Sequence, residues 1–208
     1  MHTADLYTDK INFQKYLNKN NCIDCGFPSC DAFISALKRE EIQLHQCSFI
    51  ARNNAYAFEA VDKITKLWPE VPLLVYPRPS FVGLVELNQP DERSLVLVSG
   101  NNEFTEQILL TVLGTTMCPF YVLFVDTDGN TVDMAILFKT LTAERIQTML
   151  KVSGIEIKIS HRELIIPGLA ANMQKDIAEL TGWNVRVGPV CAAELPLFLS
   201  AIWIPPEE

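Results

Sequence analysis

Apolar residues in the first third of the chain recur every three or four positions, the spacing typical of helices with one buried face. Phe58, Val61 and Ile64 share one such face. Pro69 follows and would end this helix. Prolines are then frequent, which favours an extended connector with edge strands. The pattern predicts helices over 8–19, 31–43 and 50–68, then a connector over 69–93 with short strands at 73–76 and 81–87.

From about residue 94 onward, short apolar runs alternate with helical patterns. Thr142 is a suitable N-cap for one helix, and Gly182 a suitable stop for another. This alternation predicts an α/β fold, with a largely parallel sheet covered by helices on both faces. The predicted strands are 94–98, 120–125, 131–137, 164–166 and 184–187, and the predicted helices are 103–113, 142–152, one that ends at 181, and 194–199.

The composition restricts the classes of protein to which the chain can belong. It has 208 residues, 49% of them hydrophobic and 20% charged, with a formal net charge of −8. That content excludes an intrinsically disordered protein, and the length suffices for a core without disulfides. No Lys/Arg run exceeds two residues, no apolar run approaches the ~20 residues of a membrane span, and the N-terminus lacks the apolar region of a secretory signal. We therefore expect a cytoplasmic protein with no nucleic-acid and no membrane partner.

Four of the six cysteines lie in one short stretch, with the spacing C-x2-C-x4-C-x16-C. Gly26 and Pro28 keep the first three on a tight loop, so that their sulfurs can point at a common centre. In a reducing compartment such a cluster indicates a metal site rather than disulfides. A [4Fe-4S] cluster suits four thiolates best; zinc lacks its usual second C-x2-C pair, and free thiols are the third alternative. The four residues are Cys22, Cys25, Cys30 and Cys47.

Gly, Pro, Asn or Thr residues cluster at the ends of four predicted strands. If these strands are parallel, the clusters meet at the sheet edge where ligands of open α/β sheets bind. Small residues there let a large flat ligand approach the backbone. The alternative is that they serve only the turns between strands and helices. The clusters are Gly100/Asn101, 127–129, Pro167/Gly168 and Gly188/Pro189.

Two stretches carry motifs in the order and spacing of one known family. The first is 21–33 together with Cys47, and the second runs from about 95 to 200. The landmarks of the second are Pro119, 125–129, 142–144, 160–162, 166–168, 182–183 and 187–189. On these motifs the chain resembles the large subunit of the corrinoid iron–sulfur protein of the acetyl-CoA synthase (Wood–Ljungdahl) pathway.

This resemblance implies a small helical [4Fe-4S] module at 1–50, a helix and Pro-rich connector at 51–93, and a Rossmann-like α/β/α corrinoid-binding domain at 94–208. It implies that the four clustered cysteines hold the cluster, and that the corrinoid is a cobalamin bound with its nucleotide base off the cobalt. The corrinoid contacts that it implies are Gly100, Asn101, Thr105, Thr127, Asp128, Gly129, Asn130, Pro167, Gly168, Ala171, Gly188 and Pro189.

Three functions are consistent with these features. The first is a methyl carrier whose cluster reduces Co(II) to Co(I), served by a methyltransferase or other corrinoid-dependent protein and by a low-potential electron donor. The second is an accessory electron-transfer or cobalamin-handling protein. The third is a non-catalytic binding module with a structural four-cysteine metal site. The family carries a (β/α)8 barrel between its modules, whereas only 51–93 lies between them here, so the partners of that barrel are not carried over.

Cys118 suggests a separate hypothesis. It directly precedes Pro119, on a loop that could face the corrinoid. A thiolate at this position could ligate cobalt and change its reactivity.

Overall fold

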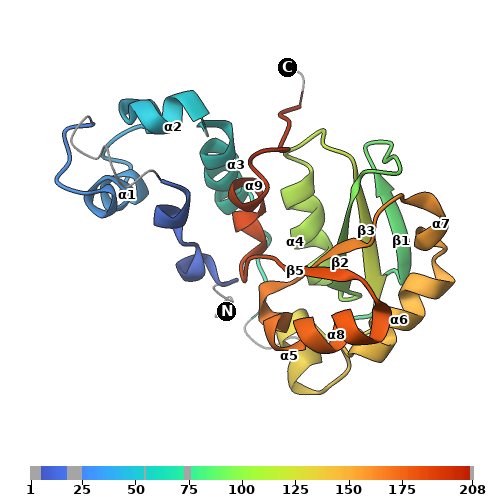
Figure 1. Ribbon diagram of the computed structural model, residues 1–208. Helices are drawn as coiled ribbons and strands as arrows, with labels where there is room; N and C mark the ends of the chain where they lie inside the picture. Colours follow the sequence, from blue (N-terminus) through green and yellow to red (C-terminus); the bar gives the residue numbers. More distant parts are fainter. Residues whose placement is uncertain (1–5, 18–24, 54, 73–75, 207–208) are drawn as a thin grey trace.

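The computed structural model describes residues 6–17, 25–53, 55–72 and 76–206 (Figure 1). Its larger part is built on one sheet, made of β1 (Gly83–Leu87), β2 (Leu95–Gly100), β3 (Phe120–Val125), β4 (Glu163–Ile166) and β5 (Asn184–Val187). The strands lie in the order β1-β3-β2-β4-β5. β2 to β5 are parallel, and β1 is an antiparallel edge strand beside β3. Since β3 flanks β2 on one side and β4 on the other, the direction of winding reverses between β2 and β4.

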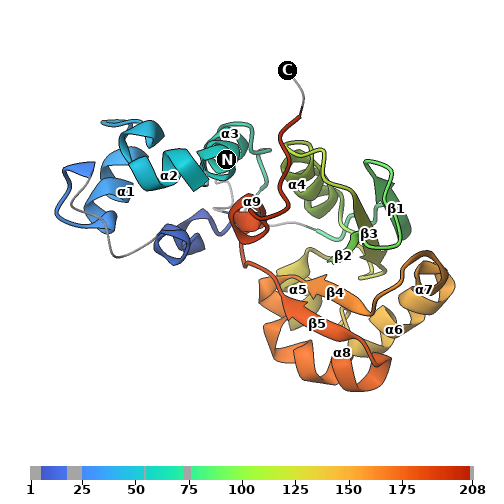
Figure 2. The same ribbon diagram turned by 45° about the horizontal axis from the view of Figure 1, so that its top comes forward.

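Helices cover both faces of this sheet (Figure 2). On one face Val96 and Val98 of β2 share a buried cluster with Ile146 and Ile177. On the other face Leu97 belongs to a second cluster, which includes residues of the helix after β2. The predicted α/β fold with a largely parallel, doubly covered sheet is confirmed. The helices are α4 (Glu103–Leu113), α5 (Val132–Leu137), α6 (Ala143–Val152), α7 (Ile155–Lys158), α8 (Gln174–Thr181) and α9 (Leu195–Phe198).

The N-terminal region is helical and packs against the end of the chain. Its helices are α1 (Cys30–Lys38), α2 (Ser48–Asn53) and α3 (Ala55–Lys66). Ile64 of α3 and Leu195 of α9 are buried in the same cluster, and the two helices lie side by side in Figures 1 and 2. The Tyr16 hydroxyl donates to Oε1 of the buried Glu194 over 2.6 Å, and burial followed by this hydrogen bond raises the pKa of Tyr16 above its usual range. The N-terminal helices and the α/β part therefore share one core.

Several elements lie where the sequence pattern predicts them. α4, β3 and β5 have the predicted bounds. Thr142 caps α6 by accepting from the Arg145 amide over 3.2 Å, and Gly182 ends α8 with a left-handed φ of 74°. The proposed division into 1–50, 51–93 and 94–208 stays a prediction.

The strand predicted over 131–137 is wrong, because this segment forms α5. A short apolar run does not by itself distinguish a strand from a helix. Here Val132, Ala135 and Ile136 recur at helical spacing and pack into the cluster beside β2 and residues 168–173, with Ala135 fully buried. Packing of this face decides the conformation.

The helix predicted over 8–19 is also wrong. The described part forms two short 3-10 turns, Thr8–Lys10 and Phe13–Tyr16, and Asn12 accepts from the Lys15 amide between them. Such side-chain acceptors compete with continuous helix formation. The helix predicted over 50–68 is divided into α2 and α3, and the strand predicted at 73–76 falls mostly outside the described residues. In the ranges that the structure describes, no helix combines the length and apolar character needed to cross a membrane.

Candidate functional site

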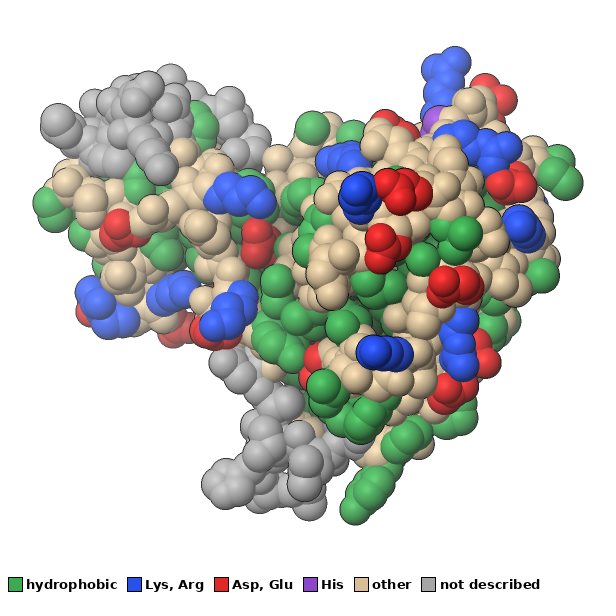
Figure 3. Space-filling model, turned by 60° about the horizontal axis from the view of Figure 1, so that its bottom comes forward, with side chains coloured by type: hydrophobic (Ala, Val, Ile, Leu, Met, Phe, Trp, Pro, Cys, Tyr) green, Lys and Arg blue, Asp and Glu red, His purple; other side chains and the backbone are tan. Residues whose placement is uncertain are grey.

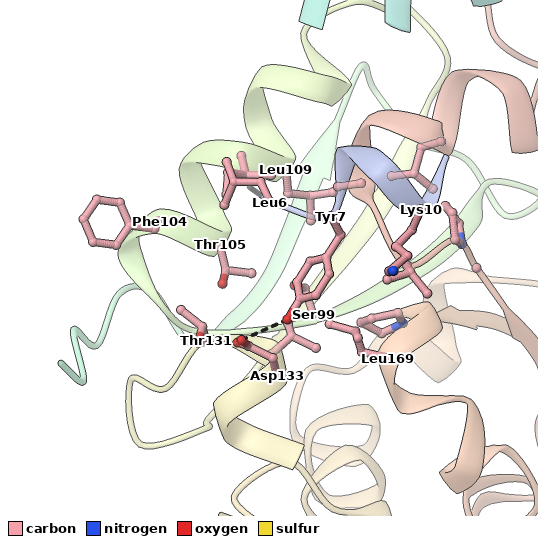
Figure 4. A pocket seen from close by; sticks show the side chains of 18 of the residues that line it. Leu6, Tyr7, Lys10, Ser99, Phe104, Thr105, Leu109, Thr131, Asp133 and Leu169 are labelled. Carbon is pink, nitrogen blue, oxygen red and sulfur yellow. Dashed lines mark hydrogen bonds between the residues drawn. The ribbon is translucent and has the colours of Figure 1, made fainter. Parts of the chain in front are cut away.

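A cavity of about 590 Å³ lies at the carboxyl edge of the sheet, between the ends of β2 and β4 (Figure 4). β2 contributes Leu97 and Ser99 to its lining, and β4 contributes Ile165 and the following Pro167. This is the point where the winding reverses, which is where open α/β sheets bind ligands. The volume lies in the usual range for small-molecule and cofactor sites.

The lining of this cavity is mainly apolar, with few polar side chains. The polar groups include Ser99 on β2, Thr105 on α4, and Thr131 and Asp133 at the start of α5. Figure 3 views the molecule from below and shows hydrophobic side chains gathered near the middle of that face. An apolar wall with a few placed polar groups is typical of a cofactor site. Apolar lining residues include Leu97, Ile108, Leu109, Ile165, Leu169 and Leu195.

Trp68, just after α3, also lines the cavity. Within the described residues its buried indole Nε1 has no hydrogen-bond partner, but this atom is not accessible from the cavity. The fit to a corrinoid rests instead on the apolar wall, its few polar groups and the small Gly and Pro residues of the loops, which suit a large flat ring with amide groups at its edge.

The N-terminal segment forms a further wall. The Tyr7 hydroxyl donates to Oδ2 of Asp133 over 3.1 Å, and both residues line the cavity (Figure 4). Burial, then the charge of Asp133 and this hydrogen bond, raise the pKa of Tyr7 to about 12. The phenol therefore stays protonated, and stays a donor, across the physiological pH range. Asp133 also accepts from the Thr131 hydroxyl over 2.5 Å.

The loops after β2 and β3 are held to each other by buried amide side chains. Asn101 Oδ1 accepts from the amide and the hydroxyl of Thr127, over 2.7 and 3.0 Å, and from the Gly129 amide over 3.3 Å. Asn130 donates back to the Thr127 carbonyl over 2.9 Å. These side chains are therefore already paired within the protein and fix the shape of the cavity's rim.

The loops after β4 and β5 approach each other through glycines. The Gly168 amide donates to the Pro189 carbonyl and the Gly188 amide to the Ile166 carbonyl, each over 2.9 Å. A Cβ atom on Gly168 would lie 2.6 Å from backbone atoms of Pro189 and Val190. The close backbone contact therefore needs glycine at position 168.

The twelve predicted corrinoid contacts divide into three groups in the structure, and their role as contacts stays a prediction. The cavity is lined by Thr105, Pro167, Gly188 and Pro189. The buried rim is formed by Gly100, Asn101, Thr127, Gly129 and Asn130. The remaining three lie around it, with Gly168 in the loop contact, Asp128 exposed and paired with Arg145, and Ala171 exposed.

Several lining residues escaped prediction from the sequence, and Tyr7, Trp68 and Asp133 are the most informative of them. Tyr7 and Trp68 precede the α/β part and reach its edge only through tertiary packing, so no local motif marks them. Asp133 lay inside the wrongly predicted strand. A helix assignment there would have placed it in the first turn, facing the same edge as the Gly and Pro clusters.

The described cysteines of the four-cysteine motif lie in the N-terminal helical region. Cys25 is on a turn where Gly26 has a φ of 77°, and Cys30 begins α1, which Ser29 caps by accepting from the Ala32 amide. Cys47 directly precedes α2. All three are half-buried and pack against the hydrophobic core, the kind of shielding that favours an iron–sulfur cluster over exposed thiols.

The ligand geometry of this motif is not assembled in the described part of the chain. Cys22 lies outside the described residues, so the structure does not place all four sulfurs. Within the described ranges no three His, Cys, Asp or Glu side chains converge on a metal-binding centre. The assignment of Cys22, Cys25, Cys30 and Cys47 as metal ligands stays a prediction.

The structure places Cys118 away from the cavity, which is evidence against the hypothesis that it faces a corrinoid bound there. Cys118 precedes the amino end of β3, whereas the cavity lies at the carboxyl edge of the sheet. Its side chain is 6% exposed and belongs to the hydrophobic core, and its burial raises the pKa of the thiol. A thiolate ligand from Cys118 is therefore disfavoured for two reasons: the residue lies at the opposite edge of the sheet from the cavity, and its raised pKa keeps the thiol protonated.

Replacing Cys118 with alanine is accordingly expected to leave the Co(II) electron paramagnetic resonance spectrum of corrinoid-loaded protein unchanged. The loss of a buried sulfur should lower the free energy of unfolding by about 1 kcal/mol. The spectrum and a denaturant titration measure the two effects. A changed cobalt spectrum in a folded variant would restore Cys118 to the site.

Comparison with known proteins identifies the family. A family model described as the CO dehydrogenase/acetyl-CoA synthase delta subunit matches residues 58–199, more than half of the chain. The chain belongs to this family. A second model, for an Fe-S cluster, matches residues 17–49, which include all four clustered cysteines.

Curated relatives of this family match the chain over part of their length. The acetyl-CoA decarbonylase/synthase complex subunit gamma of Methanopyrus kandleri is 36% identical over 57% of this chain, and that of Methanocaldococcus jannaschii is 27% identical over 93%. The corrinoid/iron-sulfur protein large subunit of Moorella thermoacetica is 33% identical over 64% of the chain. These matches cover 26%, 40% and 29% of the three relatives, so the chain spans well under half of each.

Proposed function

We propose that the chain binds a corrinoid in the cavity at the carboxyl edge of the sheet and a [4Fe-4S] cluster at its four N-terminal cysteines, and that it works as a methyl carrier. The observation that carries this proposal is a largely apolar cavity of about 590 Å³ at the switch point of the sheet. When bound, the corrinoid would supply a nucleophilic Co(I) centre, and the cluster would supply the electron that returns Co(II) to Co(I).

The chain's own residues would bind the ring and exclude water. Pro167, Gly188 and Pro189 present small, rigid loops to the cavity, which a large flat ligand can approach closely. The apolar wall, to which Trp68 contributes, would keep water away from the reacting metal. Cys22, Cys25, Cys30 and Cys47 would ligate the cluster, covered by the core of the N-terminal helices.

A carrier of this kind works with other proteins. We propose a methyltransferase or other corrinoid-dependent protein as the methyl partner, and a low-potential electron donor for the cluster. The relatives whose names place them in an acetyl-CoA decarbonylase/synthase complex support a function within a multiprotein system. Because the chain spans well under half of those relatives, the donor and the acceptor of the methyl group must be identified for this chain by experiment.

Metal counting after anaerobic reconstitution tests the proposal. The protein is reconstituted with iron and sulfide, incubated with hydroxocobalamin and desalted, and its iron, zinc and cobalt are measured with the visible spectrum. We expect about four irons and one cobalt per chain, with the spectrum of a base-off corrinoid. Iron without cobalt would contradict the carrier function and favour an accessory electron-transfer protein. Zinc in place of iron, without cobalt, would favour a binding module with a structural metal.

A turnover assay then separates a carrier from an accessory protein that binds both cofactors. A methyl group supplied by methyltetrahydrofolate or methylcobalamin should appear on the protein-bound corrinoid only if the chain is a carrier. A fully loaded protein that accepts no methyl group from any donor, even in the Co(I) state, would contradict methyl transport.

A further inference from the structure

The N-terminal segment Leu6–Lys10 lies across one side of the cavity and places a side chain within it. Leu6, Tyr7, Asp9 and Lys10 all belong to the cavity lining. Figure 4 shows the Tyr7 ring directed into the cavity, with its hydroxyl on Asp133 of α5. This hydrogen bond connects positions 126 residues apart in the sequence and joins the segment to the α/β part.

The backbone of this segment is strained at its start. Leu6 and Tyr7 both have left-handed backbone conformations, with φ of 51° and 62°, which cost energy in residues other than glycine. The turn that follows, Thr8–Lys10, contains no buried residue. Release of the segment from the cavity would relieve this backbone strain.

Tyr7 occupies both the space and the acceptor that a ligand would use. Asp133 is a carboxylate at the cavity wall, suited to the amide N–H groups at the rim of a corrinoid, and Tyr7 already donates to it. The other charged groups of the lining, Asp9 and Lys10, lie on the segment itself and form an ion pair with each other over 2.9 Å. A ligand that enters must therefore compete with Tyr7 for Asp133.

We propose that Leu6–Lys10 is a latch, held by the hydrogen bond from Tyr7 to Asp133, which a corrinoid displaces when it enters the cavity. This inference rests on the proposed function, because it takes the corrinoid as the entering ligand. The apparent affinity of such a site is reduced by the fraction of molecules in which the latch is closed. Weakening the latch raises that affinity without adding a contact to the ligand.

Two variants of Tyr7 test the latch in the full-length protein. Tyr7→Phe keeps the ring and removes the hydrogen bond, and Tyr7→Ala also removes the ring from the cavity. The matched controls are Tyr76→Phe and Tyr76→Ala, at a tyrosine that is 83% exposed. Dissociation constants for hydroxocobalamin and for cobinamide, which lacks the nucleotide base, are measured from the visible spectrum.

We expect Tyr7→Phe to bind both corrinoids about fivefold more tightly than the wild type, the effect of one ordinary hydrogen bond, and Tyr7→Ala more tightly still. The controls should bind as the wild type does. Weaker binding by both Tyr7 variants would overturn the proposal, because Tyr7 would then be a clamp on the bound ligand. Unchanged binding would overturn it as well.

Hydrogen–deuterium exchange without any corrinoid tests the closed latch independently. The amides of Lys10 and Ile11, which donate to the Tyr7 and Thr8 carbonyls, should exchange several-fold faster in Tyr7→Phe than in the wild type. Equal exchange rates would overturn the latch whatever the binding results. If neither the wild type nor any variant binds a corrinoid, the proposed function and the displacement step fail together, while faster exchange would still support a closed segment.

Discussion

Replacing Cys30 and Cys47 together with alanine is expected to reduce the iron content of reconstituted protein from about four atoms per chain to near zero. Cys30 is the first residue of α1 and Cys47 directly precedes α2, so the double change removes one thiolate from each of two separate segments. Two remaining cysteines cannot hold a cubane cluster. Iron and sulfide analysis, with the visible absorption of the cluster and its electron paramagnetic resonance signal after reduction, measures the loss.

The matched control removes the same number of cysteines elsewhere. Cys118→Ala with Cys191→Ala changes two buried core cysteines, and we expect full iron content from it. Circular dichroism and thermal melting verify that both double variants remain folded. Full iron in the Cys30/Cys47 variant would contradict the assignment of the cluster to this motif, and equal loss in both variants would show that iron content follows folding rather than ligation.

The same variants also test whether the two cofactor sites are independent. Cys25, Cys30 and Cys47, the described cysteines of the motif, do not line the cavity, so the Cys30/Cys47 variant should bind hydroxocobalamin with the affinity of the wild type. The N-terminal region does contribute Tyr7, Lys10 and Trp68 to the cavity, through a core shared with α9. Loss of corrinoid binding together with iron would mean that the cluster is needed to position those residues.

Local signals explain which elements of the fold could be predicted from the sequence. α4 starts after Asn102, whose side-chain oxygen accepts from the Phe104 and Thr105 amides. An N-cap of this kind can be recognised from a few residues of sequence. β3 is an uninterrupted apolar run whose six residues are all buried, as in a central strand covered on both faces. α5 was missed because its six residues fit a strand equally well until their packing against β2 and residues 168–173 is known.

Only those parts of the site that lie on loops at the carboxyl ends of parallel strands could be predicted from the sequence. Alternating strands and helices bring the loops after β2, β4 and β5 to one edge, so Thr105, Pro167 and Gly188 could be placed there in advance. The pairing of Asn101 with Thr127 could not, because it depends on loop geometry. Tyr7 and Trp68 could not either, because both reach this edge only through tertiary packing over long sequence separations.

Replacing Gly168 with alanine is expected to lower the affinity for hydroxocobalamin by at least about tenfold and the free energy of unfolding by about 1–3 kcal/mol. The added Cβ would lie 2.6 Å from backbone atoms of Pro189 and Val190, and neither backbone can yield as a flexible side chain does. The loops after β4 and β5 must therefore separate, which breaks the bond from the Gly168 amide to the Pro189 carbonyl. Pro167, Gly188 and Pro189 would move with them, so the wall of the cavity changes shape.

A second glycine separates cavity shape from general stability. Gly154, between α6 and α7, has a φ of 68° and open space around its missing Cβ, and it does not line the cavity. Gly154→Ala should therefore cost about 1–2 kcal/mol of stability through backbone strain and leave corrinoid affinity unchanged. If Gly154→Ala and Gly168→Ala lose corrinoid affinity equally, the loss in Gly168→Ala results from lower stability and not from a changed cavity. Wild-type affinity in a destabilised Gly168→Ala would place the corrinoid away from these loops, since a ring resting on them cannot tolerate their separation.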